Sequence, residues 1–373
     1  MSAERDVCRI AFRVDASTQI GTGHFMRCLT LADALCQRGA AVHFIARHLP
    51  QYLEAMLADR DMASTRIGSA GDPAASGGLA HAVWLGTTQE VDAVQSRNAL
   101  GDMPWNWLIV DHYALDVTWE RAMRPRVQKI AAIDDIADRI HDCDLLIDQN
   151  FHEDAAARYR ELVPAHCRLL LGPGYAMLRS EFSRLRQKTK LRFGGVSRIL
   201  VFFGGVDAAN MTSFAIQALA LVKLDGMEVD VVVGAHHPCL SEVRTLCGEL
   251  GYRCYVQTDK MADMMLGADL AIGAAGSASW ERCCLGLPAL LFSLADNQID
   301  IAQAIERLGA GKYVGGVSAI NVQQFAQMVS SVCGMPELLL NMSSKAFAVT
   351  DGGGVFRVCS QLVSDNENIH SMH

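Results

Sequence analysis

The sequence lacks the patterns that mark several classes of functional site. Its 373 residues contain no CxxC pair, no HExxH, no GxxxxGKS or GxxxxGKT loop and no GxSxG elbow. These absences remove sequence support for a paired-thiolate site, a zinc protease, P-loop nucleotide chemistry and acyl transfer at an activated serine. The adjacent His236 and His237 have no carboxylate or cysteine at ligand spacing, so we expect neither a metal site nor a cofactor.

Long apolar runs and blocks of positive charge are also missing. No apolar run approaches the roughly 18 residues that a spanning helix needs, and the N-terminus shows no secretory leader pattern. The formal net charge is -8 and no block of about five or six Lys or Arg occurs, which disfavours nucleic acid as a partner. We therefore expect a cytoplasmic monomer with no nucleic-acid or membrane partner, whose twelve cysteines are mostly buried thiols.

Half of the residues are hydrophobic, and they form short runs that alternate with helical patterns. The segment VCRIAFRVDASTQIGTGHFMRCLTLADALCQRG, from Val7, and the segment RILVFFGGVDAANMTSFAIQALALV, from Arg198, each predict a strand, a glycine-bearing turn and a helix. Further strands are predicted at AVHFIA, WLIVDHY, KIAAIDD, DLLIDQN, EVDVVVGA, DLAIGAAG and PALLFS. Such runs are typical of parallel sheets buried on both faces, so the predicted fold class is α/β with two Rossmann-like domains.

We place the domain boundary near residue 190, because the basic stretch RLRQKTKLRF (residues 184–193) is typical of a solvated connector. Residues 1–190 would form an N-terminal Rossmann-like domain that carries the catalytic loop. Residues 191–373 would form a C-terminal Rossmann-like domain with a frayed tail after Asp365. Open α/β sheets bind ligands beyond the carboxyl ends of their strands, so we expect the two parallel sheets to face each other across a cleft.

The stretch IGTGHFMRC opens the first predicted helix and contains Gly21, Gly23 and His24. Its GxG spacing suits a dinucleotide fingerprint, but Met26 replaces the third glycine and the next strand does not end in an acid. What remains is a tight turn at a helix N-terminus, where free N–H groups favour negative charge and a neutral imidazole. His24 is therefore a candidate general base; the alternative is that it caps the turn or packs beneath it.

Other polar residues and glycines also follow predicted strands. VDHYAL places Asp111 and Tyr113 directly after one strand, where side chains can reach a ligand, although a strand-end turn with a buried tyrosine has the same pattern. FFGGVDAAN ends a strand in Gly204 and Gly205, whose backbone can approach a diphosphate closely. Two glycines after a strand are also an ordinary turn, so both interpretations stay open.

The stretch IGAAGSASWERCCLGLP predicts a strand, a small-residue loop and a helix that opens near Ser277. Glu281, in the first turn of that helix, can accept hydrogen bonds from two ribose hydroxyls or simply complement the helix dipole. Asn297 and Gln298 follow the next strand, and their amides can bind sugar or phosphate, or cap a helix. The pattern alone does not choose between these roles.

Taken in order, several blocks resemble the UDP-sugar hydrolases of bacterial pseudaminic acid biosynthesis. The blocks are FRVDASTQIGTGHFMRCLTLADAL, IVDHY, IDD, GPGYAMLRSEF, FFGGVDAAN and GAAGSASWERCCLGLPAL, and they run from about Phe12 to Arg357. The resemblance implies the two-domain GT-B fold, whose C-terminal half is similar to that of the glycosyltransferase that makes lipid II. It also implies a small-molecule substrate, UDP-2,4-diacetamido-2,4,6-trideoxy-β-L-altropyranose, from which UDP is cleaved. We expect water to attack the anomeric carbon with inversion.

On this resemblance the catalytic residues are His24, which activates water, and Tyr113, which positions the sugar or the water. UDP would lie against the C-terminal domain, with its diphosphate near two glycines and its ribose on Glu281. The predicted substrate-binding residues are Asp15, Gly21, Gly23, Arg27, Asp111, Gly204, Gly205, Ser277, Glu281, Asn297 and Gln298.

Three alternatives stay open. A GT-B glycosyltransferase would use the same UDP site but pass the sugar to an acceptor hydroxyl; lipid-dependent ones usually show an apolar or basic patch on the N-terminal domain, and the sequence shows none there. A non-catalytic nucleotide-sugar binder would keep the fold without the chemistry, and the presence of His24 and Tyr113 in their motifs argues against it. The third is a hydrolase of another UDP-sugar, because similarity of fold does not specify sugar stereochemistry.

Overall fold

The computed structural model of the protein describes residues 7–75, 78–222 and 226–363. The chain divides into two compact units. Unit 1 consists of two segments, the residues up to Met177 and the residues from Gly354 onward, and unit 2 consists of Leu178–Gly353. The tail that we expect to be frayed lies outside the described residues.

Unit 1 is built on a seven-stranded parallel sheet with the strand order β3-β2-β1-β4-β5-β6-β7. The strands are β1 (Arg9–Val14), β2 (Ala41–Ala46), β3 (Ala63–Arg66), β4 (Trp105–Asp111), β5 (Val127–Ile133), β6 (Leu145–Asp148) and β7 (Arg168–Leu171). Its helices are α1 (Gly23–Cys36), α2 (Gln51–Ala58), η1 (Ala82–Leu85), α3 (Gln89–Leu100), α4 (Val117–Met123), η2 (Arg124–Arg126), α5 (Ala155–Tyr159), η3 (Pro173–Tyr175) and α14 (Gly354–Val363).

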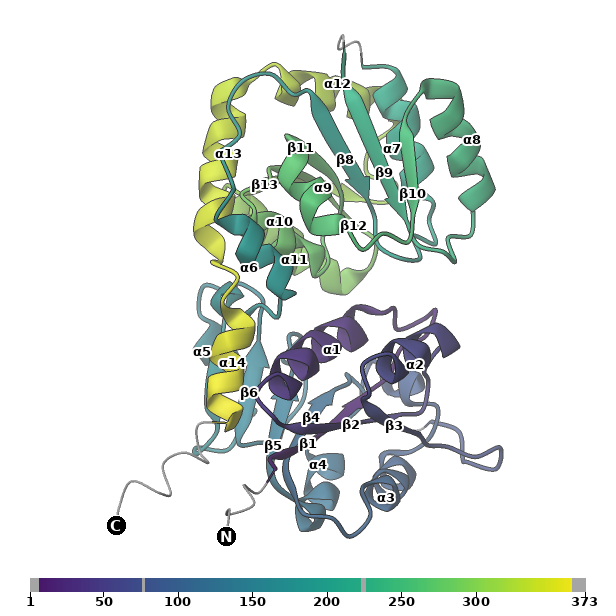
Figure 1. The fold of residues 1–373 in the computed structure, drawn as a ribbon, viewed down its shortest axis with the longest axis vertical. Helices are drawn as coiled ribbons and strands as arrows, with labels where there is room; N and C mark the ends of the chain where they lie inside the picture. The colour runs from purple at the N-terminus through teal and green to yellow at the C-terminus, as the bar shows by residue number, and fades with distance from the viewer. Residues whose placement is uncertain (1–6, 76–77, 223–225, 364–373) are drawn as a thin grey trace. The chain divides into compact units, whose positions relative to one another are not determined.

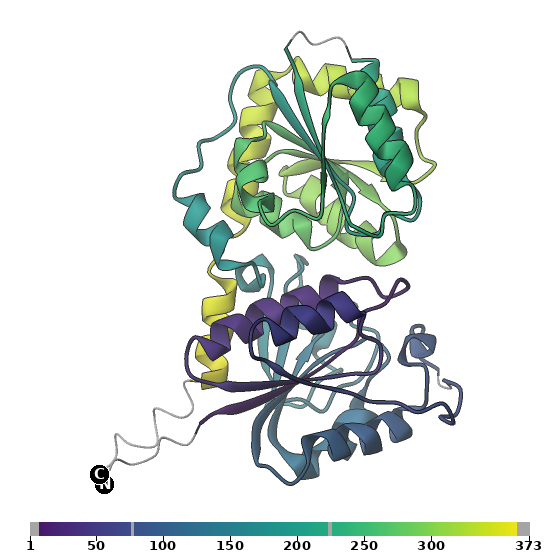
Figure 2. The same ribbon diagram turned by 45° about the vertical axis from the view of Figure 1, so that its right-hand side comes forward.

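Helices cover both faces of this sheet. Helices α1, α2 and α14 lie on one face, and α3 and α4 on the other (Figures 1 and 2). Both faces of the central strands are therefore buried, as their apolar runs predict. In α1 the predicted stripe of Phe25, Leu29, Ala32 and Leu35 is buried against the sheet, and the helix stops before Gly39, whose φ is 83°.

Unit 2 has a six-stranded parallel sheet with the order β10-β9-β8-β11-β12-β13. The strands are β8 (Arg198–Phe202), β9 (Glu228–Val233), β10 (Arg253–Val256), β11 (Leu270–Ala274), β12 (Ala289–Ser293) and β13 (Gly311–Gly316). The helices are α6 (Ser180–Arg186), α7 (Met211–Ala220), α8 (Leu240–Leu250), α9 (Met261–Gly267), α10 (Ala278–Cys284), η4 (Asp296–Gln298), α11 (Ile299–Arg307), α12 (Val322–Cys333) and α13 (Pro336–Val349). The two α/β units confirm the predicted fold class.

The order of strands reverses once in each sheet. In unit 1 the reversal lies between β1 and β4, and in unit 2 between β8 and β11. Loops that leave the carboxyl ends of two such strands diverge and leave room for a ligand. The motifs IGTGHFMRC and VDHYAL follow β1 and β4, and FFGGVDAAN and GAAGSASWER follow β8 and β11. All four motifs therefore lie at the switch points.

The observed division of the chain differs from the predicted boundary near residue 190. Part of the basic stretch RLRQKTKLRF is not a solvated connector but is anchored to unit 2. The Arg192 side chain is buried and donates to the carbonyl oxygens of Ala268 (3.1 Å) and Met265 (3.0 Å), and Arg186 donates to that of Cys284 (2.7 Å). Arginines that satisfy backbone carbonyls belong to the unit that supplies those carbonyls.

The last described helix returns to unit 1, which the predicted range 191–373 for the second domain did not anticipate. Helix α14 packs on α1, and its Val358, Cys359 and Leu362 lie in the same hydrophobic core as β1. The Trp107 indole N–H in β4 donates to the carbonyl of Leu362 at 2.8 Å. The core of unit 1 therefore contains residues from both ends of the described chain.

In the described part of the chain, no helix is both long enough and apolar enough to cross a membrane.

A buried ionic cluster beneath β5 and β6 makes the stability of unit 1 depend on pH. The His141 imidazole lies 2.7 Å from a Glu120 carboxylate oxygen and 3.7 Å from one of Asp134, and all three side chains are buried. Burial lowers the pKa of His141, but Glu120 and then Asp134 outweigh it and raise the pKa to about 9. The charged imidazole thus stabilises the fold below the unfolded pKa of about 6.5, and this contribution is lost as the pH rises through about 9.

We predict that the difference in unfolding free energy between the wild type and H141Q shrinks by up to about 3 kcal/mol between pH 6 and pH 10. Urea denaturation at both pH values measures this difference, and groups that titrate equally in both proteins cancel. The H166Q variant is the matched control, because the side chain of His166 is 61% exposed. A wild-type to H141Q difference that stays constant over this range would contradict the assignment.

Candidate functional site

The candidate site of unit 1 begins with the turn between β1 and α1. Gly21 closes this turn: its N–H donates to the carbonyl of Ser17 at 2.8 Å, and its φ is 80°, a conformation that disfavours other residues. Helix α1 then starts at Gly23, which places His24 in its first turn. Gly21 therefore shapes the loop through its backbone conformation, since a Cβ there would meet no atom within 4 Å, and Gly23 is the first residue of the helix.

His24 forms a dyad with Asp111, the last residue of β4. Its Nδ1 lies 2.5 Å from Asp111 Oδ1. A carboxylate only accepts hydrogen bonds, so Nδ1 donates, and a ring with its one proton on Nδ1 has Nε2 left to accept a proton. The side chain of Asp111 is fully buried and that of His24 is 11% exposed, so the base and not the acid can reach a ligand.

Arg27, one turn further along α1, clamps the same carboxylate. Its Nε donates to Asp111 Oδ2 at 2.6 Å and its Nη2 to Oδ1 at 2.7 Å, a bidentate pair. Burial raises the pKa of Asp111, but Arg27 and then His24 outweigh it and hold the pKa far below its ordinary value. Asp111 therefore stays ionised and fixes both side chains. The sequence predicts that Arg27 and Asp111 bind substrate. In the structure both residues are buried next to His24.

Tyr113 joins the same cluster through Asp135. The Tyr113 hydroxyl donates to Asp135 Oδ1, and Arg27 Nη1 donates to Oδ2 of the same carboxylate at 2.8 Å. Burial, followed by the charge of Asp135, raises the pKa of Tyr113 well above its ordinary value, so the phenol is neutral. Its ring packs edge-on against the ring of His24, with centroids 4.6 Å apart. The structure thus brings the two predicted catalytic residues into contact.

Asp135 contacts both Arg27 and Tyr113, and it is absent from the residues predicted from the sequence. It lies just beyond β5, the neighbour of β4, in the motif IDD. Because the carboxyl ends of neighbouring parallel strands meet at one edge of a sheet, a polar residue at the end of the next strand is the signal that could have identified it.

Asp15 has a different environment from the one we predicted. It is fully buried, and its carboxylate accepts from Arg13 Nη1 (2.6 Å) and from the backbone N–H of Arg47 (2.7 Å). Arg13 in turn donates to Asp92 at 2.7 Å, so Asp15 belongs to an internal ionic network that joins β1 to α3. The structure does not bring Asp15 to the surface near His24, and this placement does not support a role in contacting substrate.

In unit 2 the predicted glycines lie just beyond β8. Gly204 has a φ of 99°, and a Cβ at either Gly204 or Gly205 would meet no atom within 4 Å, so the backbone is open on that side. The N–H groups that open α7 are already engaged, because Asp207 accepts from those of Met211 (3.0 Å) and Thr212 (2.8 Å). An anion at this switch point would therefore meet the glycine backbone and not the first turn of the helix.

The other predicted residues of unit 2 lie near β11 and β12. Ser277 is the N-cap residue of α10, and its side chain makes no capping hydrogen bond. Glu281 follows in the first turn; its carboxylate lies 3.8 Å from Arg179, and burial raises its pKa. Asn297 is exposed, whereas the side-chain oxygen of Gln298 accepts from the N–H of Leu294 at 2.9 Å. Among the predicted ligands of unit 2, Glu281 thus offers a half-buried carboxylate whose ion-pair contact, to Arg179, is long.

No group of three or more His, Cys, Asp or Glu side chains that could hold a metal ion occurs in residues 7–75, 78–222 and 226–363.

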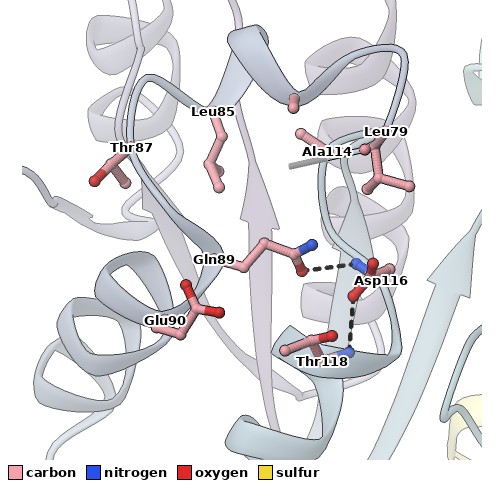
Figure 3. Close-up of a pocket in the computed structure, with 10 residues that line it drawn as sticks. Leu79, Leu85, Thr87, Gln89, Glu90, Ala114, Asp116 and Thr118 are labelled. Atoms are coloured by element: carbon pink, nitrogen blue, oxygen red, sulfur yellow. Dashed lines mark hydrogen bonds between the residues drawn. The ribbon is translucent and has the colours of Figure 1, made fainter. Parts of the chain in front are cut away.

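A separate cavity of about 290 Å³ lies beneath η1 in unit 1 (Figure 3). None of the predicted site residues is among the described residues that line it. Two of its polar side chains are paired with the backbone: the Gln89 side-chain oxygen accepts from the N–H of Asp116 at 3.1 Å, and the Asp116 carboxylate accepts from that of Thr118 at 2.8 Å, whereas the buried Thr87 hydroxyl has no hydrogen-bond partner. The cavity is therefore no part of the site around His24.

The dyad predicts an unusual tautomer for His24. We expect the neutral ring to carry its proton on Nδ1 in the wild type, because Asp111 accepts from that atom. In D111N this preference should weaken, since the carboxylate that accepts from Nδ1 is gone. Histidine-selective ¹⁵N NMR at pH 8, with His24 assigned from an H24N spectrum, measures the tautomer. A wild-type ring protonated on Nε2 would contradict the prediction.

No protein-family model matches the chain. The spore coat polysaccharide biosynthesis protein SpsG of Bacillus subtilis (strain 168) is 27% identical over 207 residues, which cover 55% of this chain and 61% of that protein, less than two thirds of its length. The UDP-2,4-diacetamido-2,4,6-trideoxy-beta-L-altropyranose hydrolase of Campylobacter jejuni is 25% identical over 303 residues, covering 81% of this chain and 97% of that protein.

Among solved structures, the crystal structure of MurG from Acinetobacter baumannii superimposes with a TM-score of 0.66. The match covers 96% of this chain and 99% of that one at 14% sequence identity. A likeness at this identity concerns the fold alone. Together with the two parallel sheets and their switch points, it shows that the chain has the GT-B fold.

Proposed function

We propose that the chain processes a UDP-sugar, and specifically that it hydrolyses UDP-2,4-diacetamido-2,4,6-trideoxy-β-L-altropyranose by attack of water at the anomeric carbon with inversion. The observation that carries the proposal is the His24–Asp111 dyad, because Asp111 accepts from Nδ1 and so leaves Nε2 of a side chain that is 11% exposed to accept a proton. The similarity to the Campylobacter jejuni hydrolase over 81% of the chain supports this choice of substrate.

In the proposed reaction, Nε2 of His24 takes a proton from the attacking water. The water oxygen forms a bond to the anomeric carbon as the bond from that carbon to UDP breaks, and UDP leaves with the electron pair. Asp111 stabilises the resulting imidazolium from the Nδ1 side, at 2.5 Å. His24 then returns the proton to solvent. A separate general acid is unnecessary, because a diphosphate is a stable anion once it has left.

The remaining site residues have supporting roles in the proposal. Arg27 holds Asp111 by its bidentate contact, and Tyr113, whose hydroxyl is committed to Asp135, presents an oxygen that accepts a hydrogen bond from the sugar or the water. Gly204 and Gly205 supply backbone to the diphosphate, where charge grows as the bond breaks.

For the nucleoside, we propose that Glu281 accepts from the two ribose hydroxyls. Its side chain is 20% exposed, desolvation raises its pKa, and two hydroxyl donors would compensate for that loss of water. Ser277 precedes α10 after β11, and Asn297 and Gln298 lie in η4 after the neighbouring strand β12; we propose that these three residues contact the nucleotide.

A glycosyltransferase is the second candidate, favoured by the GT-B fold that the chain shares with MurG over 96% of its length. In that reaction His24 would deprotonate an acceptor hydroxyl in place of water. The two candidates differ in what happens without an acceptor, because only a hydrolase then releases free sugar at a useful rate.

The position of bond cleavage tests the proposal directly. We expect incubation with the UDP-sugar in H₂¹⁸O, with no acceptor, to release sugar that carries ¹⁸O on the anomeric carbon and UDP that carries none. Mass spectrometry locates the label, and rapid NMR identifies the first anomer formed. Label in the UDP phosphate would refute attack at carbon, and the absence of turnover would favour the transferase.

Replacement of His24 tests the base. We predict that H24N lowers kcat by about a hundredfold to ten-thousandfold, the usual contribution of a positioned base, and leaves the Ki of UDP within a few-fold of the wild type. Steady-state kinetics with UDP as a product inhibitor measure both constants. The control is H166N, which removes an exposed imidazole of the same unit. If kcat in H24N stays near the wild-type value, His24 is not the base.

A further inference from the structure

The five tryptophans of the chain differ sharply in exposure. Four of them, Trp105, Trp107, Trp119 and Trp280, are between 0% and 7% exposed and lie in the interiors of the two units. Trp84 is the exception, because it is only partly buried. A large aromatic ring left partly open to water is informative when it lies beside a reactive group.

Trp84 lies beside the proposed base. Its ring is nearly parallel to that of Tyr113, with centroids 5.6 Å apart and an interplanar angle of 27°, and it meets the ring of His24 edge-on at 6.4 Å. His81 packs against Trp84 with centroids 4.5 Å apart. Four rings therefore form one cluster, of which Tyr113 is buried while Trp84 is partly open.

The backbone around Trp84 fixes the direction of its ring. Trp84 and Leu85 are consecutive residues of η1, and Leu85 is 1% exposed and anchored in the core of unit 1. Gly86 ends this helix with a φ of 72°, and a Cβ there would come within 2.8 Å of the His48 ring. The turn after η1 therefore requires glycine, and with Leu85 held inside, Trp84 is presented on the side of His24.

We propose that Trp84 is a sugar-binding platform: its indole face packs against the apolar C–H face of the pyranose whose anomeric carbon is presented to His24. The negative face of an aromatic ring attracts the weakly positive C–H groups of a sugar. A pyranose that carries a methyl group and acetamido groups in place of hydroxyls has more apolar surface to offer than an ordinary hexose. This inference rests on the proposed function and adds the residue that selects this class of sugar.

His81 completes the platform. Its Nδ1 is buried and has no hydrogen-bond partner, and burial, with smaller contributions from Arg139 and His24, lowers its pKa. Because this atom is closed to water, an acetamido group can reach it only if the ring turns, and a neutral imidazole then offers it one hydrogen bond. The platform would thus combine one apolar face with one polar atom, as ligand sites commonly do.

The kinetic test compares W84A and W84F with V83A. Val83 is the matched control, because it is the neighbouring exposed apolar residue of η1 (64% exposed) and makes no ring contact with the base. We expect W84A to raise KM for the UDP-sugar by about tenfold, with kcat within a few-fold of the wild type and the Ki of UDP unchanged. W84F should recover most of the loss, and V83A should behave as the wild type.

A fluorescence test works even if no hydrolysis occurs, so the two proposals can fail separately. Because the other tryptophans are buried, acrylamide quenching reports mainly on Trp84. In H24N, the UDP-2,4-diacetamido sugar should protect the fluorescence from acrylamide, and UDP alone should not. Equal protection by UDP and the UDP-sugar, no protection by either, or an unchanged KM in W84A would overturn the platform and leave the role of His24 untouched.

Discussion

The buried carboxylate of Asp111 is the interaction on which the geometry of unit 1 depends. It accepts from His24, from Arg27 and from the Cys28 thiol, three residues of α1, and so ties the start of that helix to the end of β4. A buried charge that loses a partner is costly, so the three donors and the acid hold one another in place. Through Arg27 the same network reaches Asp135 and Tyr113.

The central strands could be predicted from the sequence because they are buried on both faces and read as apolar runs. Three edge strands could not be predicted in this way. Strand β3 (Ala63–Arg66) has three exposed residues out of four. Strands β10 (Arg253–Val256) and β13 (Gly311–Gly316) are mostly half-buried and contain polar residues or glycines. Edge strands lack a neighbour on one side and need less apolar surface, so their local pattern is close to that of a loop.

The motifs, together with the family resemblance, pointed to His24 and Tyr113 one by one as candidates, but they could not show that His24 pairs with Asp111, 87 residues away, because only the order of strands brings them together. Asp135 was missed for the same reason. Asp15 shows the converse: it follows a strand in a matching motif, yet Arg13 and the Arg47 backbone enclose it. A position in a motif predicts where a residue lies, whereas its partners decide whether a ligand can reach it.

The return of α14 (Gly354–Val363) to unit 1 bears on how the protein is made. During synthesis, β1 to β7 emerge long before Val358 and Leu362, which complete the core around α1. Until α14 leaves the ribosome, an apolar face of unit 1 stays open to water. Of the two units, most of unit 1 is thus translated first but its core is completed last, and a fragment ending at Met177 would keep that face exposed and be prone to aggregation.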